Sequence, residues 1–313
     1  MEEALKAPLA RFSTIKIGGE ADRLCQPTNS DELVKLVNKL NDKGDPWSIV
    51  GGGSNLLISS KGVTGTVIRT AYLKDIKTKE KDVIEADAGT RLPHLAKYAA
   101  QLGLSGLEFA VGIPGTVGGA VIMNAGAHGS CIANILESAL IYDSEKDNLE
   151  TVAAEDLGFV YRNCNLDPAR HVVVSARFRL TPGSAEDISK KTQANEDYRW
   201  KTQPIGWPNL GSTFKNPQPD KTAGFLLDNA GAKKLQIGQA AVSSLHANFV
   251  VNLGNATSSE VTKLLKEMQN VVMKAHNIGL NPEWKTLGNF SEEELEAWTK
   301  AAQPGGAGIL PAS

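Results

Sequence analysis

Residues 47–58, WSIVGGGSNLLI, place three successive glycines between two short apolar runs. The runs at 47–50 and 56–58 are typical of strands. Because Gly51, Gly52 and Gly53 carry no Cβ, the backbone N–H groups of this loop can approach a diphosphate closely and converge on it. The stretch therefore predicts short strands joined either by a phosphate-binding loop or by a glycine-rich hairpin turn.

The residues around this loop exclude two common phosphate-binding motifs. A P-loop requires GxxxxGK[ST], and no lysine follows the glycines here. A Rossmann site requires GxGxxG at the start of a helix, whereas LLI at 56–58 reads as extended. The fold is therefore expected to hold a nucleotide in some other way.

A second glycine-rich segment covers residues 112–127, GIPGTVGGAVIMNAGA. Pro114 before Gly115 favours a rigid turn, and Gly118 with Gly119 allows another backbone or a flat ligand to pack closely. Purely structural packing is the alternative interpretation. Two such segments in successive parts of the chain favour one extended dinucleotide lying between them.

Composition sets the class of protein. The chain has 313 residues, of which 41% are hydrophobic, so we expect a large buried core and two or three domains. A net charge of -2 gives no general attraction for nucleic acid or an anionic membrane. No apolar signal core begins the chain, and no Cys or His cluster has metal-ligand spacing. These features predict a cytoplasmic protein without a metal; the oligomeric state stays open, with a monomer slightly favoured.

Apolar periodicity predicts an α+β fold. We expect helices at residues 31–43, 92–104, 185–199, 223–229 and 258–276. We expect strands at residues 47–50, 56–58, 63–69, 83–88, 136–143, 171–180, 247–253 and 282–287. The helix at 185–199 is the predicted place of a domain boundary, and residues 291–313 are expected to form a mobile tail.

Three polar residues stand in contexts that suit chemistry. Arg162, in FVYR, can grip a carboxylate through two parallel hydrogen bonds. Ser212, in GSTFKNP, follows a glycine that could leave its hydroxyl exposed, although this is no GxSxG motif. Glu283 begins the last expected strand. Each also has an ordinary interpretation as a solvated or turn residue, so the residues alone do not give the reaction.

Read in order, the motifs resemble the UDP-N-acetylenolpyruvoylglucosamine reductase (UDP-N-acetylmuramate dehydrogenase) family. The resemblance covers roughly residues 13–288. It rests on TIKIGGEA (14–21), GGGSNLLI (51–58), GIPGTVGGAVIMNAGAHG (112–129), FVYR (159–162), GSTFKNP (211–217), AVSSLHANFVVN (241–252) and NPEWKTLG (281–288). Only eight residues, 163–170, join Arg162 to the next expected strand, so the chain is similar to the short subclass that lacks an inserted substrate-clamping loop.

The resemblance implies a two-part FAD-binding region of the vanillyl-alcohol-oxidase (PCMH) type and a C-terminal α+β substrate domain. It implies a first FAD subdomain at 1–70, rejoined by about 280–290, a second at 71–198 and a substrate domain at 199–279. It also implies an NADPH-dependent, FAD-mediated reduction in peptidoglycan synthesis. The substrate would be the enolpyruvyl ether of UDP-N-acetylglucosamine enolpyruvate, and the product UDP-N-acetylmuramate.

The resemblance also assigns roles to residues. Arg162 and Glu283 would polarise the substrate carboxylate and stabilise the carbanion-like intermediate, and Ser212 would donate a proton to it. FAD contacts are implied for Gly51, Gly52, Gly53, Ser54, Asn55, Gly112, Pro114, Gly115, Thr116, Gly118, Gly119 and Arg162. Substrate contacts are implied for Tyr161, Lys201, Lys215, Asn216 and His246.

Three departures from the family pattern leave other interpretations open. Cys164 stands where a serine is usual, Asn209 and Leu210 precede Gly211 where small residues are usual, and Trp284 replaces an aliphatic residue. One alternative is an oxygen-using flavin oxidase on the same scaffold. Another is a non-catalytic protein that binds a nucleotide sugar.

Overall fold

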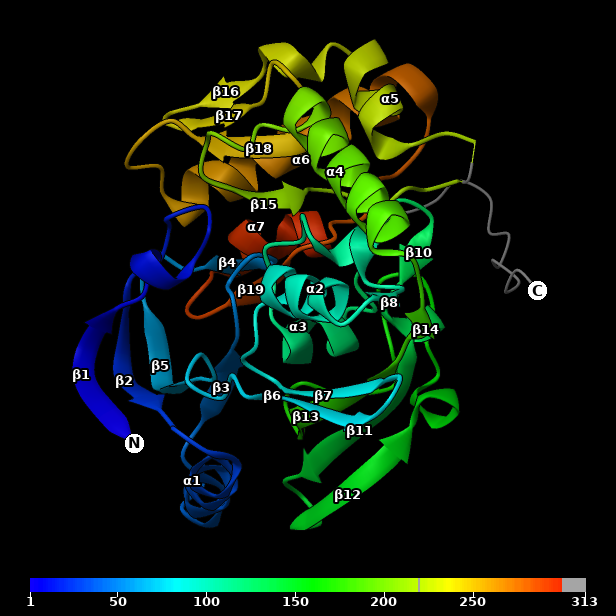
Figure 1. Ribbon diagram of the computed structural model, residues 1–313. Coiled ribbons are helices and arrows are strands. Elements are labelled where there is room, and N and C mark those ends of the chain that lie inside the picture. Colours follow the sequence, from blue (N-terminus) through cyan, green and yellow to red (C-terminus); the bar gives the residue numbers. More distant parts are fainter. Residues whose placement is uncertain (219, 300–313) are drawn as a thin grey trace.

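The computed structural model describes residues 1–218 and 220–299. Its N-terminal part contains a four-stranded sheet (Figure 1). Its order is β1-β2-β5-β3, formed by Glu2–Pro8, Glu20–Gln26, Val63–Arg69 and Trp47–Val50. Strand β5 runs parallel to β2 and β3, and the crossover between β2 and β3 is helix α1, Ser30–Asp42. The Asn29 side chain caps α1 by accepting from the Glu32 N–H, and Leu33 and Val37 are buried beneath it. The polar helix face lies in solvent, as the sequence pattern predicts.

The end of the chain returns to this N-terminal part. Strand β4, Leu56–Ile58, pairs in parallel with β19, Lys285–Leu287. The Ser59 N–H also donates to the Leu287 carbonyl at 2.8 Å. The end of the first glycine loop at Asn55 therefore lies next to the segment that leads into β19.

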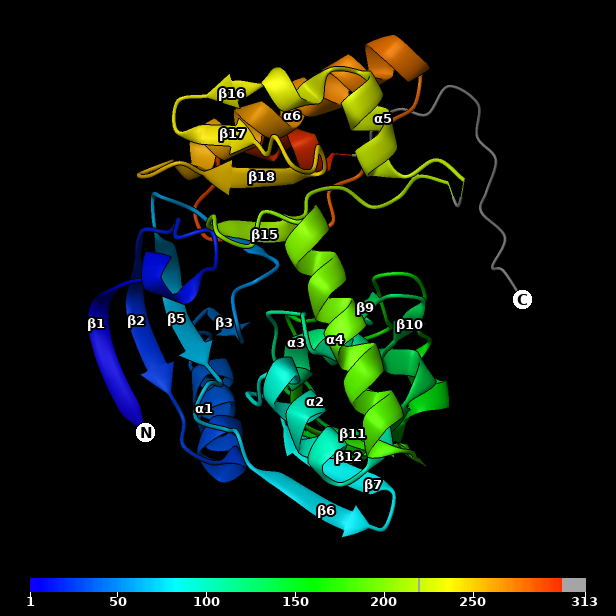
Figure 2. The ribbon, with the colours of Figure 1, turned by 45° about the horizontal axis from the view of Figure 1, so that its top comes forward.

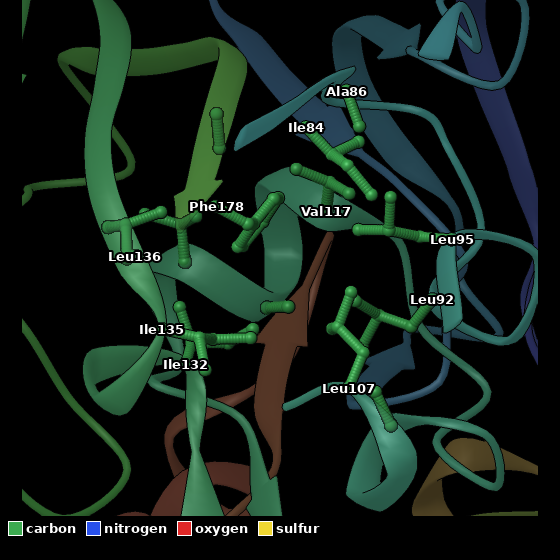
Figure 3. Packing of buried hydrophobic residues seen from close by; sticks show 14 of the residues in the cluster. Ile84, Ala86, Leu92, Leu95, Leu107, Val117, Ile132, Ile135, Leu136 and Phe178 are labelled. Atoms are coloured by element: carbon green, nitrogen blue, oxygen red, sulfur yellow. The ribbon is translucent and has the colours of Figure 1, made fainter. Parts of the chain in front are cut away.

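A second sheet of five antiparallel strands follows. Its order is β12-β11-β13-β7-β6, formed by Asn148–Ala153, Leu136–Asp143, His171–Arg179, Val83–Asp87 and Ile76–Glu80. Helices α2, Leu92–Gln101, and α3, Val117–Ile122, cover it. Figure 3 shows Ile84 and Phe178 of the sheet gathered around Val117 of α3. Gly118 lets α3 approach closely, since a Cβ there would lie 3.0 Å from the Cβ of Ala88.

The C-terminal part is a third sheet with two helices, reached through helix α4, Ala185–Thr202 (Figure 2). The sheet order is β15-β18-β17-β16, formed by Asn209–Ser212, Phe249–Asn252, Ala240–Val242 and Gln236–Ile237. Helices α5, Ala223–Asn229, and α6, Ser258–His276, pack with this sheet in one hydrophobic cluster. The buried stripe of α6 is the one that the sequence predicts, Val261, Leu264, Leu265, Met268 and Val272.

Short elements complete the described chain. The remaining strands are β8 (Leu104–Ser105), β9 (Gly126–Ala127), β10 (Ser130–Cys131) and β14 (Thr181–Pro182). The 3₁₀ helices are η1 (Ala10–Phe12), η2 (Glu108–Ala110), η3 (Ile132–Asn134), η4 (Ala154–Leu157), η5 (Ala232–Lys234) and η6 (Glu296–Trp298). None of the helices in the described residues is long and apolar enough to cross a membrane.

The expected elements agree with the structure where apolar periodicity is strong. The strands predicted at 47–50, 56–58, 63–69 and 136–143 and the helices predicted at 223–229 and 258–276 are confirmed with those bounds. The strand predicted at 282–287 is wrong in its first half, because only residues 285–287 pair with β4. The domain boundaries near residues 70, 198 and 279 stay predictions.

Residues 291–299 correct one expectation. We expected residues 291–313 to form a mobile tail, but α7, Glu292–Leu295, and η6 pack against α6. Glu294 is buried there and accepts hydrogen bonds from Lys61 and Ser259, and the Trp298 Nε1–H donates to the Trp284 carbonyl at 2.9 Å. The prediction is wrong for 291–299, and residues 300–313 lie outside the described residues.

Candidate active site

An ion pair between Arg162 and Glu283 joins two distant parts of the chain. The Arg162 Nε–H donates to Glu283 Oε1 at 2.7 Å, and its Nη2–H donates to the Gly126 carbonyl at 2.9 Å. Arg162 has a φ of +57° in a tight turn closed by two backbone hydrogen bonds between Val160 and Asn163. Such a backbone is uncommon for a residue with a side chain, so the turn fixes where the guanidinium can point.

Glu283 reaches this position through backbone pairing with the segment that carries Ser212. The Glu283 N–H donates to the Thr213 carbonyl at 2.8 Å, and the Lys215 N–H donates to the Asn281 carbonyl at 2.9 Å. The Glu283 side chain is 14% exposed. Its burial raises the pKa of the carboxyl above the ordinary value, although the charges of Arg162 and Lys215 oppose this. The site therefore favours a protonated Glu283 more than water does.

Ser212 stands at the edge of the same group of residues. It ends β15 opposite Phe249, where the register shifts after a Gly211 with a φ of +75°. The side chain is partly exposed, and its hydroxyl has no hydrogen-bond partner among the described residues. A hydroxyl without a protein partner is free to donate to a ligand.

The two glycine-rich segments are in direct contact. A Cβ on Gly51 would lie 2.3 Å from Thr116 Oγ1, and one on Gly52 would lie 3.2 Å from the Pro114 carbonyl oxygen. Thr116 is 4% exposed, and its Oγ1 is buried without a hydrogen-bond partner in the described chain. A residue with a side chain at position 51 or 52 would therefore push the two segments apart.

The same segments present backbone donors without acceptors. Within residues 1–218 and 220–299, no acceptor is found for the N–H groups of residues 51–55, Thr116 and Gly119. Gly53 has a φ of +61°, which helps its loop curve. Buried or clustered N–H groups seldom stay unpaired, so this set together with Thr116 Oγ1 fits the phosphates of a dinucleotide.

Hydrogen bonds tie this donor cluster to the ion pair. The Lys285 N–H donates to the Asn55 carbonyl at 3.0 Å, and the Asn55 Nδ2–H donates to the Glu283 carbonyl at 3.3 Å. The loop expected to bind a nucleotide and the residue expected to act on substrate therefore share one backbone framework.

The residues expected to bind substrate fall into two groups. Tyr161 is 52% exposed with the Arg162 guanidinium 5.1 Å from its ring centre, and Lys215 lies close enough to Glu283 to affect its pKa. Within the described residues, the side chains of the other three form no hydrogen bond or salt bridge with Arg162 or Glu283. Asn216 accepts from the Ala223 N–H, His246 packs on Phe249 and accepts from the Asn248 N–H, and Lys201 is exposed in the last turn of α4.

Cys164, a departure from the family pattern, has a defined place. Its thiol is buried and lies 3.4 Å from the Ile122 carbonyl, to which it donates. Burial raises the pKa of this thiol, so it stays protonated and able to donate. The hydrogen bond that a serine would make at this position is thus supplied by the thiol.

Sequence reasoning missed Arg199. This residue of α4 lies against Gly112, since a Cβ on that glycine would be 2.3 Å from Arg199 Cδ. The polar run of α4 gave no signal that set one of its charged residues apart.

Comparisons with known proteins agree on one family. Residues 203–287 match the family described as UDP-N-acetylenolpyruvoylglucosamine reductase, C-terminal domain, and residues 21–145 match the FAD binding domain family. The chain is 44% identical to the UDP-N-acetylenolpyruvoylglucosamine reductase of Synechococcus sp. strain RCC307, over 93% of this chain and 95% of that protein. It is 41% identical to the one from Caldicellulosiruptor saccharolyticus, over 94% of each chain.

A solved structure shows the same arrangement. UDP-N-acetylenolpyruvylglucosamine reductase from Thermus caldophilus superposes with a TM-score of 0.77 and 34% identity, covering 91% of this chain and 98% of that one. The predicted fold class is confirmed, an α+β protein with an FAD-binding region of the vanillyl-alcohol-oxidase type before a C-terminal substrate domain. The chain belongs to the UDP-N-acetylenolpyruvoylglucosamine reductase family.

Proposed function

We propose that this chain uses FAD and NADPH to reduce the enolpyruvyl ether of UDP-N-acetylglucosamine enolpyruvate to UDP-N-acetylmuramate, in the cytoplasm, for peptidoglycan synthesis. The observation that carries the proposal is the pairing of Arg162 with Glu283, whose side chain is 14% exposed and whose backbone N–H donates to the carbonyl of the residue after Ser212. This group adjoins a cluster of free N–H donors through Asn55. The relatives named above are reductases of this substrate, which supports the assignment.

The two glycine segments hold the cofactor in this proposal. The free N–H groups of residues 51–55, Thr116 and Gly119 donate to the FAD phosphates, and Thr116 Oγ1 gains a partner there. Gly112, Pro114, Gly115 and Gly118 shape the segment that presents these donors. Bound FAD supplies hydride transfer from NADPH to the substrate double bond.

Three side chains of this chain manage the charge that hydride addition creates beside the substrate carboxylate. Arg162 is cationic at all relevant pH values and offsets developing negative charge. Burial raises the pKa of Glu283 and so favours its protonated form, which can donate a hydrogen bond to the oxygens of that carboxylate. The Ser212 hydroxyl gives its proton to the neighbouring carbon, which is a much stronger base than water.

The remaining candidates bind the UDP-sugar. Burial lowers the pKa of Lys215, and a diphosphate beside it would favour the charged form. Tyr161 presents an exposed ring at the edge of the site. We include Lys201, Asn216 and His246 as outer contacts for the nucleotide.

Stopped-flow absorbance tests the proposal in two separate half-reactions. In Ser212→Ala, NADPH should bleach the bound flavin at the rate of the unchanged protein, while return of the yellow colour on adding the enolpyruvyl substrate should slow by about 10²–10⁴-fold. Ser244→Ala removes an exposed hydroxyl of the same part of the chain and serves as the control. Equal reoxidation rates in the two variants would refute the role of Ser212, and a purified protein that takes up no FAD would refute the whole proposal.

A further inference from the structure

Arg199 is a partly buried cation that has no partner in residues 1–218 and 220–299. Its Nε atom is buried and unbonded, and its guanidinium makes no ion pair with a described residue. Burial separates the group from water and lowers the pKa of the guanidinium. Arg162, Arg170 and Arg177 differ, because each holds a carboxylate at 2.5 to 2.7 Å.

The surroundings of Arg199 place it next to the second glycine segment. Its stem occupies the space that a side chain on Gly112 would need, at 2.3 Å from the ideal Cβ. Tyr198, one residue earlier on α4, packs edge-on against His128 with ring centres 5.4 Å apart. His128 belongs to the β9–β10 hairpin, and the Gly126 carbonyl of that hairpin accepts from Arg162. Arg199 thus lies beside the turn that leads to the donor cluster and near the hairpin that holds Arg162.

A contact that does not involve the guanidinium also holds α4 in place. The Asn195 Nδ2–H donates to the Glu108 carbonyl at 2.9 Å and ties α4 to η2. Removing part of a charge from water without giving it a hydrogen-bond partner costs free energy. A guanidinium held in this way is therefore suited to receive a ligand with hydrogen-bond acceptors.

We propose that Arg199 binds FAD, donating hydrogen bonds from its guanidinium to oxygen atoms of the cofactor beside Gly112. The inference deepens the proposed function and rests on it, since it presumes that FAD occupies the glycine segments. The Gly112 turn continues directly into Pro114 and Thr116, which meet the first glycine loop. A guanidinium at this turn adds side-chain charge to a site otherwise built from backbone donors.

The test compares Arg199→Met, Arg199→Lys and the control Lys190→Gln, which removes an exposed charge from the same helix. Each apoprotein is titrated with FAD by fluorescence quenching, and its thermal unfolding is measured without FAD. We expect Arg199→Met to raise the Kd for FAD at least about tenfold, Arg199→Lys to raise it less, and Lys190→Gln to leave it unchanged. Unfolding of the Arg199→Met apoprotein should occur at an equal or higher temperature.

Gly112→Ala gives a second, independent variant. Its new methyl group displaces the Arg199 stem, so the Kd for FAD should rise while the guanidinium remains in the chain. Unchanged FAD affinity in Arg199→Met, with a raised KM for the UDP-sugar, would assign the guanidinium to substrate and overturn the inference. Unchanged FAD affinity with a lower unfolding temperature would make Arg199 structural, which also overturns it. Failure of the unaltered protein to bind FAD would instead refute the proposed function.

Discussion

A methyl group at Gly51 should push apart the two segments that we assign to FAD. In Gly51→Ala the Cβ would stand 2.3 Å from Thr116 Oγ1, whereas ordinary contact begins at 3.4 Å, so the Thr116 side chain or the backbone that carries it must give way by about 1.1 Å. A hydrogen bond of about 2.9 Å stretched by this amount is lost. Each lost bond to a charged phosphate costs about 1.5–3 kcal/mol, which corresponds to about a 10- to 150-fold weaker Kd for FAD.

Removing the obstructing atom should cancel the effect of the new methyl group. Thr116→Ala alone should weaken FAD binding by about 1.5–3 kcal/mol, the contribution of one hydrogen bond to a charged phosphate. In the double variant the nearest Thr116 atom that remains would be the Cβ, at 3.6 Å from the new methyl group, an ordinary contact. The Kd of Gly51→Ala/Thr116→Ala should therefore approach that of Thr116→Ala.

Equilibrium dialysis of the apoproteins with FAD measures this cycle. Gly206→Ala is the matched control, because its Cβ would meet nothing within 4 Å and its φ lies outside the left-handed region. A double variant that binds FAD as weakly as the product of the single effects would refute the reasoning, since no steric coupling between the two segments would then exist.

Three further changes test other parts of the structure. Burial raises the pKa of Glu283, and its protonated form serves the reaction, so the rate of flavin reoxidation by substrate should fall as pH rises through that pKa. Below that pKa, Glu283→Gln should reoxidise flavin more slowly than the unchanged protein, and its rate should lose this pH dependence. Stopped-flow absorbance measures both rates. Cys164→Ser should keep FAD content and turnover within about twofold, because serine donates to the same carbonyl, and a tenfold loss would contradict this. Burial alone would raise the pKa of Glu294, but hydrogen bonds from Lys61 and Ser259 lower it to about 2. Glu294→Gln should therefore lower the free energy of unfolding at neutral pH by about 1–3 kcal/mol, and the difference should vanish as pH falls from 4.5 through about 2, measured by urea unfolding.

Helix α6 is an element that the sequence predicts from its own residues, because they bury an apolar stripe. Helix α6 presents an apolar residue every three or four positions, and its capping box at Thr257 and Glu260 marks its start. Strand β1 has the opposite character, because six of its seven residues are exposed. Its extended form comes from pairing with β2, and no periodicity within EEALKAP can reveal partners that lie 12 to 24 residues further along the chain.

The site was predictable in its parts but not in its contacts. The glycines at residues 51–53 predict that another group lies close to this backbone, but only the structure shows that the group next to Gly51 is Thr116. Arg162 and Glu283 are 121 residues apart, and their pairing depends on a turn with positive φ at Arg162. Arg199 escaped notice because its distinguishing property, the absence of a partner, is a property of the folded chain.

The return of the chain through β19 connects cofactor binding to acid–base chemistry. Asn55 belongs to the first glycine loop, yet its amide holds the carbonyl of Glu283, 228 residues later. When that loop moves, the backbone of Glu283 should therefore move with it, and so should the carboxyl that faces Arg162. Variants that loosen the loop, such as Gly51→Ala, should consequently lose reoxidation rate even when saturated with FAD, whereas a site with independent halves would lose affinity alone.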